Sequence, residues 1–254
     1  MSRPADTFSQ LFFEVFESLP RQGPGSRNSA AKALSFCREL PSGPLILDLG
    51  CGSGSQAFHL AELTSGSVVA LDSHAPSIDK LRAAAASRGY DSRIRAVVGD
   101  MSKPDLPRDS FDLIWSEGAF YNIGIACALD VCRPLLRAGG YLAFTDAVWR
   151  KENPPASVKA VFDQDYPGMG RAEEIVALIQ KAGFALIGQL MLPDEDWWDD
   201  FYTPMELRID ELRQKYSGDK EALAALAALA EEPEMHRRHA ACYGYSFFIA
   251  RLAK

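Results

Sequence analysis

Residues 48–54 read Asp-Leu-Gly-Cys-Gly-Ser-Gly, and this stretch decides the fold. It follows the apolar run Pro-Leu-Ile-Leu of residues 44–47 and precedes the helix-like segment Gln-Ala-Phe-His-Leu-Ala of residues 56–61. The order predicts a strand, a glycine turn and a helix. Glycines at every second position let the backbone turn sharply and leave room for a ligand against the main chain. The pattern indicates a site for a nucleoside-bearing cofactor.

The position of the third glycine distinguishes between cofactors. A dinucleotide-binding turn has a glycine or alanine three residues after its second glycine, where the helix opens toward a pyrophosphate, and here that residue is Ser55. The third glycine is instead Gly54, and the acid Asp48 precedes the turn, which suits a cofactor with an ammonium group and no phosphate. A second apolar run ends at Asp72, eighteen residues after Gly54, where a carboxylate can accept both ribose hydroxyls.

At these residues the chain resembles the class I S-adenosylmethionine-dependent methyltransferases of the small-molecule type. The first motif of that family is acid-x-Gly-x-Gly-x-Gly, and its second strand ends in a ribose-binding acid. The resemblance is clear over roughly residues 28–150 and looser elsewhere. It implies S-adenosyl-L-methionine as cofactor and S-adenosyl-L-homocysteine as product. It also implies an α/β fold with a Rossmann-like, seven-stranded, mostly parallel sheet, helices on both faces, an antiparallel last strand and helical lid insertions.

Three later segments follow the order of the same family. Residues 94–101 form a strand pattern that ends in Gly-Asp-Met. In the family, the acid at the place of Asp100 accepts a hydrogen bond from the adenine amino group, and Met101 could pack on the ring. Residues 111–117 match the fourth strand, whose end faces the methyl group, and residues 133–142 match the helix, Gly-Gly turn and fifth strand.

The candidate cofactor-binding residues come from the glycine turn, the strand ends and an N-terminal loop. The loop of residues 21–26, Arg-Gln-Gly-Pro-Gly-Ser, is expected to approach the methionine end of the cofactor, with a plain linker ending in a helix cap as the alternative. Ordinary alternatives also exist for the acids, namely a surface turn at Asp72 and a helix N-cap at Asp100. The full candidate set is Arg21, Gly23, Asp48, Gly50, Gly52, Gly54, Gln56, Asp72, Ser73, Asp100, Met101, Ser116 and Glu117.

The catalytic candidates are Glu117 and Tyr121, just beyond the fourth expected strand, because ligands bind outside the carboxyl ends of such strands. A sulfonium is an activated methyl donor, so a dry cleft that positions the acceptor supplies most of the acceleration. A hydroxyl or ammonium acceptor also needs a base, for which Glu117 is the first candidate; its alternative role is helix capping. The candidates for acceptor binding, with core packing as the alternative for the aromatic ones, are Tyr121, Asn122, Asp146, Trp149, Trp198 and Tyr202.

Length and composition predict one domain. A chain of 254 residues with 47% hydrophobic content can bury a large α/β core. Residues 7–19 form an amphipathic segment that would cap the cofactor edge, and residues 243–251 resemble the last strand. The expected parts of residues 1–254 are an N-terminal cap helix and loop at 1–27, a cofactor-binding core at 28–150, and lid or substrate insertions at 149–167 and 193–240.

Charge and cysteine content bear on the expected binding partners and cellular location. The net charge is −7, and no basic run exceeds the pair Arg237 and Arg238, so we expect no nucleic-acid partner. No segment reaches transmembrane length, and the N-terminus lacks a signal-peptide pattern, so we expect no membrane partner. Five cysteines without paired spacing favour the cytoplasm. The expected partner is a small-molecule methyl acceptor, and the expected state is a monomer or homodimer.

Other interpretations remain open. Residues 153–155, Asn-Pro-Pro, look like a motif for planar nitrogen acceptors, but they follow the fifth expected strand rather than the fourth and indicate a loop into a helix. His236, His239 and Cys242 recur at helical spacing, but a basic helix end explains them better than a metal site, so no metal is expected. The alternatives in function are an NAD(P)-dependent oxidoreductase and a non-catalytic cofactor-binding protein on the same fold.

Overall fold

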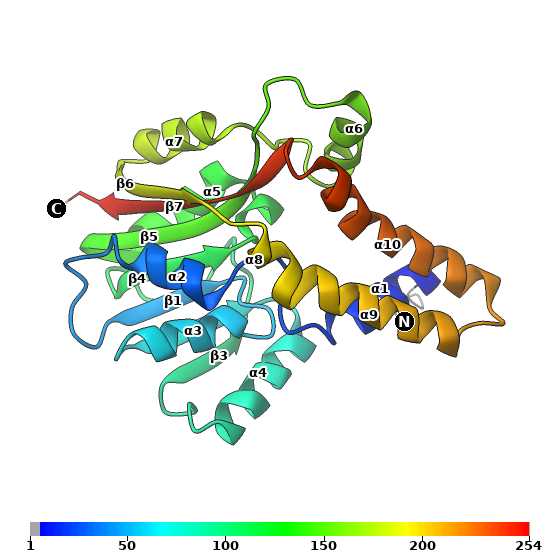
Figure 1. Cartoon of the computed structure of the whole chain (residues 1–254). Helices are drawn as coiled ribbons and strands as arrows, with labels where there is room; N and C mark the ends of the chain where they lie inside the picture. The colour runs from blue at the N-terminus through cyan, green and yellow to red at the C-terminus, as the bar shows by residue number, and fades with distance from the viewer. Residues whose placement is uncertain (1–5, 254) are drawn as a thin grey trace.

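A single seven-stranded sheet organises the computed structural model, which describes residues 6–253 (Figure 1). The strand order is β3-β2-β1-β4-β5-β7-β6. Strand β7 runs antiparallel to both β5 and β6, and the other neighbouring strands are parallel. The predicted α/β class and antiparallel last strand are therefore confirmed. The strands are β1 Leu45–Leu49, β2 Ser67–Asp72, β3 Ile94–Val98, β4 Phe111–Glu117, β5 Leu136–Trp149, β6 Phe184–Met191 and β7 Tyr243–Leu252.

Helices cover both faces of the sheet and enclose two apolar cores. One core lies under α2, α3 and α4 and includes Phe58 and Leu81; the other lies under α5 and α7 and includes Leu129 and Ile179. The α-helices are α1 Thr7–Phe16, α2 Arg27–Leu34, α3 Ser55–Leu63, α4 Ala75–Ser87, α5 Ile125–Cys132, α6 Ala156–Asp165, α7 Ala172–Lys181, α8 Glu195–Trp197, α9 Thr203–Lys215 and α10 Lys220–His239. Short 3-10 helices span η1 Phe120–Asn122 and η2 Arg133–Leu135, and a π-helix spans η3 Trp198–Tyr202.

The glycine turn joins β1 to α3, as its sequence pattern predicts. Gly50 and Cys51 donate backbone hydrogen bonds to the carbonyl of Leu71, which fix the turn against β2. Gly54 begins the helix in the left-handed region at φ 92°, and a Cβ there would collide with the side chain of Leu81 in α4. Glycine at this position is therefore required for close packing as well as for backbone conformation.

A third apolar core lies outside the sheet, where α1 packs against α9 and α10 (Figure 1). Leu11 and Val15 of α1 contribute to it, together with Met205 of α9 and Leu226 of α10. Glu14 of α1 also binds α9 and the residues after it through Lys215, Arg208 and Tyr216. The predicted insertion at 193–240 therefore holds α8, η3, α9 and α10. Among residues 6–253, no helix combines the length and apolarity that a membrane span needs.

Candidate active site

A cavity of about 1240 Å³ opens at the carboxyl ends of β2 and β4, between the sheet and the helices α1 and α10. Ligand sites for one drug-sized molecule enclose about 300–1,000 Å³, so this cavity has room for a cofactor and an acceptor. The residues predicted for the site that line this cavity are Arg21, Gly23, Gly50, Gly52, Gln56, Asp72, Ser73, Asp100, Met101, Glu117, Tyr121, Asn122 and Tyr202.

Six other predicted residues do not line the cavity: Asp48, Gly54, Ser116, Asp146, Trp149 and Trp198. The buried Ser116 hydroxyl donates to a main-chain oxygen of β1 at 2.8 Å. The Trp149 indole donates to a main-chain oxygen after α6 at 2.9 Å. Trp198 lines a separate pocket and carries the guanidinium of Arg237 over its ring, 4.7 Å from the ring centre. These three side chains have structural partners in place of an open ligand site.

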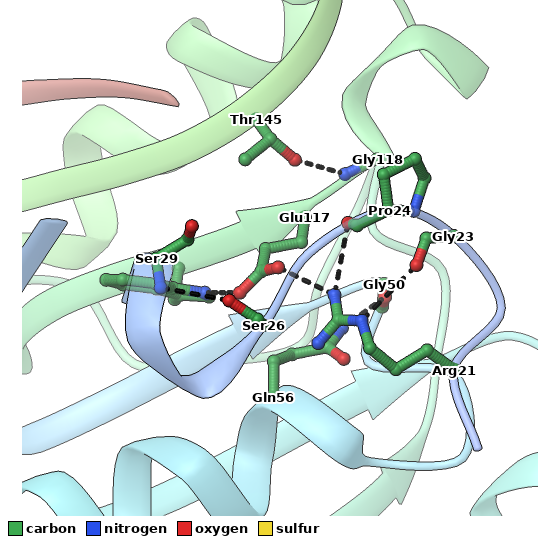
Figure 2. A network of polar contacts seen from close by, with 11 residues as sticks. Arg21, Gly23, Pro24, Ser26, Ser29, Gly50, Gln56, Glu117, Gly118 and Thr145 are labelled. Carbon is green, nitrogen blue, oxygen red and sulfur yellow. Dashed lines mark hydrogen bonds and ion pairs between the residues drawn. The ribbon is translucent and has the colours of Figure 1, made fainter. Parts of the chain in front are cut away.

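A buried ion pair closes one side of the cavity. Arg21 Nη2 lies 2.7 Å from Glu117 Oε2, and the two side chains are only 4% and 2% exposed. The other carboxylate oxygen, Oε1, accepts from the indole of Trp115 at 2.7 Å. Arg21 also donates to the carbonyls of Gly23 and Pro24, as Figure 2 shows. Both oxygens of Glu117 are thus held by donors, which suits a positioning group better than a base that must accept a proton.

The loop of residues 21–26 carries Arg21 into this position. The backbone amide of Arg21 donates to the carbonyl of Asp200, and that of Gly25 donates to the carbonyl of Asp196 at 2.9 Å. At its end, Ser26 caps α2 by accepting from an amide of the first turn at 3.1 Å. The helix cap that the sequence allowed is therefore present, and the same loop also lines the cavity.

Gly25 makes the ion pair possible, since a Cβ there would lie 2.5 Å from Arg21 Nη2 and 2.6 Å from Glu117 Oε2. We expect Gly25→Ala to lower the free energy of unfolding by about 2–4 kcal/mol, because the methyl group separates the two charges and its φ of 141° disfavours a side chain. Urea unfolding measures this. Gly23→Ala is the matched control: a Cβ there meets no atom within 4 Å, and equal losses in both variants would contradict the prediction.

Asp72 and Asp100 each use a carboxylate oxygen to order a turn. Asp72 accepts from the amide of Gly52 at 2.9 Å and from that of His74 at 2.8 Å, one bond to each oxygen. Asp100 is exposed and accepts from the amide of Ser102 at 2.7 Å, which lowers its pKa. The cap-like geometry considered for Asp100 is therefore present. Each carboxylate oxygen has two lone pairs, so both acids keep acceptor capacity toward the cavity.

Asp48 lies beneath the glycine turn and is completely buried. Within residues 6–253, neither of its side-chain oxygens has a hydrogen-bond partner. Burial raises its pKa well above the usual range, the charges of Glu117 and Asp72 raise it further, and Arg21 opposes them. The buried Nη1 of Arg21 likewise has no partner in the described chain. Buried polar groups are nearly always paired, so the Nη1 of Arg21, a residue that lines the cavity, points to a polar ligand there.

Asp146, near the carboxyl end of β5, is a second buried acid. Among the residues that the structure describes, no group reaches ideal hydrogen-bonding geometry with either of its oxygens. The amide of Ala147 and the hydroxyl of Tyr166 nevertheless lie near enough to favour its charged form. Burial outweighs both and raises the pKa of Asp146 to about 7. Tyr166 lines the cavity, so Asp146 stands behind a cavity-lining hydroxyl rather than in the wall itself.

Aromatic side chains that the sequence analysis did not assign to the site form much of the remaining lining. We call the part of the cavity lined by α1, α6, α8, η3, α10 and β7 the aromatic chamber. Two sequence signals could have found it: phenylalanine at every fourth position of α1, and alternate tyrosines at the start of β7. The residues missed are Phe8, Phe12, Phe16, Phe162, Tyr166, Phe201, Tyr243 and Tyr245.

His236 has structural partners beside this chamber. Its ring stacks on Trp197 with ring centres 4.1 Å apart. One ring nitrogen lies 3.1 Å from Asp194 Oδ1 and the other 3.3 Å from the Tyr243 hydroxyl. Burial lowers its pKa, which favours the neutral ring. Among residues 6–253, no cluster of three or more His, Cys, Asp or Glu side chains is arranged to hold a metal ion.

The sequence of this chain is similar to those of known methyltransferases. A family model described as a methyltransferase domain matches residues 46–140. Among curated proteins, 24-methylenesterol C-methyltransferase 2 of Oryza sativa subsp. japonica is 28% identical over 224 residues, covering 76% of this chain and 60% of that protein. Sarcosine/dimethylglycine N-methyltransferase of Halorhodospira halochloris is 29% identical over 142 residues, covering 55% and 50%. Residues 46–140 therefore form a methyltransferase domain, and the chain is similar to S-adenosylmethionine-dependent methyltransferases.

The solved structures agree on the fold of this methyltransferase. A SAM-dependent methyltransferase from Geobacter sulfurreducens, solved in complex with S-adenosyl-L-homocysteine, superposes with a TM-score of 0.80 at 21% identity. The match covers 95% of this methyltransferase and 97% of that chain. By contrast, the chain spans only about half to three fifths of the length of the two curated relatives. Their acceptors, a sterol and an amino acid by name, differ widely in size and polarity.

Proposed function

We propose that this methyltransferase transfers a methyl group from S-adenosyl-L-methionine to a small-molecule O, N, C or S acceptor by in-line displacement, releasing S-adenosyl-L-homocysteine. One observation carries the proposal: the large cavity joins the glycine turn, Asp72 and the Arg21–Glu117 pair at the carboxyl ends of β2 and β4. Cofactors of doubly wound sheets bind at this edge. The volume left for a second molecule supports an acceptor beside the cofactor.

The polar groups around the cavity fit the parts of this cofactor. The unpartnered Nη1 of Arg21 suits a carboxylate, and the Glu117 carboxylate favours an ammonium group near the turn. Asp72 keeps acceptor capacity for ribose hydroxyls. Gly52 lets a ligand approach the backbone closely. We propose that these residues hold the cofactor and that Glu117, already bound by Arg21 and Trp115, orients it rather than acting as a base.

The chain itself has to position the acceptor and exclude water. S-adenosyl-L-methionine supplies a methyl group bound to a sulfonium sulfur, and this sulfur departs readily as a neutral sulfide. We propose that the aromatic chamber holds the acceptor, with Tyr121 and Asn122 of η1 orienting it. Trp149 and Trp198 remain predictions for substrate binding that no contact with the cavity supports. A dry, preorganised chamber is the main source of acceleration for such a transfer.

Replacing Asp72 tests the cofactor assignment. We expect Asp72→Asn to weaken S-adenosyl-L-methionine binding about 10–100-fold in calorimetric titration, because a hydrogen bond to a charged acceptor contributes about 1.5–3 kcal/mol. Asp79→Asn, on the exposed face of α4, is the matched control and should bind like the wild type. NADH titrated in parallel tests the oxidoreductase alternative. Tight NADH binding without binding of the adenosyl compounds would overturn the proposed function.

A non-catalytic cofactor-binding protein is the remaining alternative, and product formation distinguishes it. Release of S-adenosyl-L-homocysteine with any acceptor would exclude a binding-only role. We also propose a cytoplasmic location, since Cys37, Cys51, Cys127, Cys132 and Cys242 are all free thiols. Free thiols of this number are typical of a reducing compartment.

A further inference from the structure

The aromatic chamber differs in character from the cofactor end of the cavity. Phe12 of α1, Phe162 of α6, Phe201 of η3 and Tyr243 of β7 come from four separate elements and face one space. Flat rings from several directions give van der Waals contact and offset stacking to a flat, apolar ligand. A short hydrophilic molecule would leave most of this surface without a partner. The walls therefore select a rigid body with large apolar faces.

Charge in the chamber disfavours an anionic acceptor. Glu231 and Glu232 of α10 line the space, and the Tyr202 hydroxyl lies 3.1 Å from Glu232 Oε1. Arg238 also lines it, but this guanidinium already lies 2.6 Å from Glu234 Oε1. A carboxylate or phosphate on the acceptor would therefore meet two acids and a cation that is already paired. His239 is the other ionisable base at this wall.

Polar groups gather at the sheet end of the chamber. The ring of Tyr166, after α6, lies 5.5 Å from that of Tyr121 in η1, four residues beyond Glu117. Behind them lies Asp146, completely buried and without an ideal hydrogen bond to either oxygen. Burial raises the pKa of the Tyr166 and Tyr245 hydroxyls, and the charge of Asp146 raises the pKa of both further. A buried carboxyl beside a ligand cavity, with a pKa of about 7, has the properties of a general base.

We propose that the acceptor is an uncharged, flat, largely apolar molecule with a weakly acidic hydroxyl, and that Asp146 takes the proton of this hydroxyl through Tyr166. In the transfer, the acceptor oxygen forms a bond to the methyl carbon as the carbon–sulfur bond breaks. The hydroxyl proton of the acceptor passes to Tyr166, whose own proton moves to the Asp146 carboxylate. The products are a methyl ether, neutral S-adenosyl-L-homocysteine and a protonated Asp146. This inference rests on the proposed function and names its substrate class.

The burial of Asp146 supports this role. Its pKa of about 7 leaves the carboxylate available as a base at neutral pH while keeping enough basicity to hold a proton. The groups that face it are Tyr166 after α6, Tyr245 of β7 and the backbone amide of Ala147. None of these is a cation, so nothing in this set stabilises the carboxylate as Arg21 stabilises Glu117. Glu117 and Asp146 therefore have different roles, because one is paired with a cation and the other is not.

The test uses the full chain and three flat phenols as probes, 2-naphthol, 1-hydroxyanthraquinone and estradiol, with sarcosine as the small hydrophilic comparison. Calorimetry with S-adenosyl-L-homocysteine present measures probe binding, and S-adenosyl-L-homocysteine release measures turnover. We expect micromolar binding and turnover of at least one phenol and neither with sarcosine. Failure of all three phenols to bind or to turn over overturns the inference. The proposed function still stands if S-adenosyl-L-methionine binds, which separates the two failures.

Two variants test the proton path with the active phenol. Asp146→Asn should lower kcat about 100-fold or more, leave KM within about twofold and abolish the rise of kcat through pH 7. Tyr166→Phe, which retains the ring, should lower kcat about 10-fold. Because two variants are used, a folding defect in one of them still leaves the other as a test. Asp163→Asn, on the exposed face of α6, is the control. A wild-type pH profile in both Asp146→Asn and Tyr166→Phe would overturn the role of this pair.

Discussion

Replacing Arg21 with methionine is expected to lower the free energy of unfolding by about 3–5 kcal/mol, because the change leaves the Glu117 carboxylate buried without its cation. The indole of Trp115 would still donate to it. The carbonyls of Gly23 and Pro24 would lose their side-chain donor as well, so the loop would keep only its backbone hydrogen bonds and the Ser26 cap. Equilibrium unfolding in urea at neutral pH measures the loss.

Two further variants make this prediction specific. Arg27→Met breaks an exposed pair with Glu62 in the same part of the chain, where such pairs contribute about 0–1 kcal/mol. The double variant Arg21→Met with Glu117→Gln removes both buried charges and should recover part of the lost stability. If Arg21→Met lowered the free energy of unfolding no more than Arg27→Met does, the Arg21–Glu117 pair could not be a stabilising buried ion pair.

Asp146→Asn is expected to raise the free energy of unfolding above pH 7 by about 2–4 kcal/mol. Burial raises the pKa of Asp146 from 3.8 to about 7 in the folded state. The folded protein thus keeps a proton that the unfolded chain releases, and stability falls as the pH rises from about 4 to 7. An amide does not ionise, so the advantage of the variant should be absent near pH 4, grow up to pH 7 and remain constant above it.

Unfolding curves at a series of pH values between 4 and 8 would measure this difference. Asp163→Asn changes an exposed carboxyl on α6 and should show the pH dependence of the wild type. A gain from Asp146→Asn that is the same at every pH would contradict the assignment, because it would come from packing rather than from ionisation. If Asp146→Asn raised stability and lowered turnover, Asp146 would be a carboxyl that destabilises the fold and is needed for catalysis.

The arrangement of the core was predictable because local sequence patterns indicate each of its elements. A strand, a glycine turn and a helix follow one another over about twenty residues at 44–63, and each has its own signal in apolar runs and glycine spacing. Asp72 follows by the same logic, since parallel strands end at one edge of the sheet. The antiparallel β7 came from resemblance to the family. Local patterns do not state strand direction.

Other features of the site depend on contacts between distant segments. Arg21 and Glu117 are separated by 96 positions, and no spacing rule connects a loop arginine with a strand-end acid. Trp198 and Trp197 are neighbours in sequence, yet Trp197 lines the cavity and Trp198 lines another pocket. Trp197 ends α8 and Trp198 begins the π-helix η3, so the two neighbouring rings belong to different elements and line different pockets.

The sequence by itself determined the sheet, the glycine turn and the position of Asp72 at a strand end, because these follow from short-range periodicity and from the shared edge of parallel strands. Only the tertiary structure decided which acid is paired and which is not. Glu117 contacts Arg21 and Trp115, while Asp146 faces tyrosines and, within residues 6–253, no cation. That difference arises from which elements pack above each strand end. The same packing brings α1, α6, α10 and β7 around one chamber, since side chains from distant segments meet only when the chain is folded.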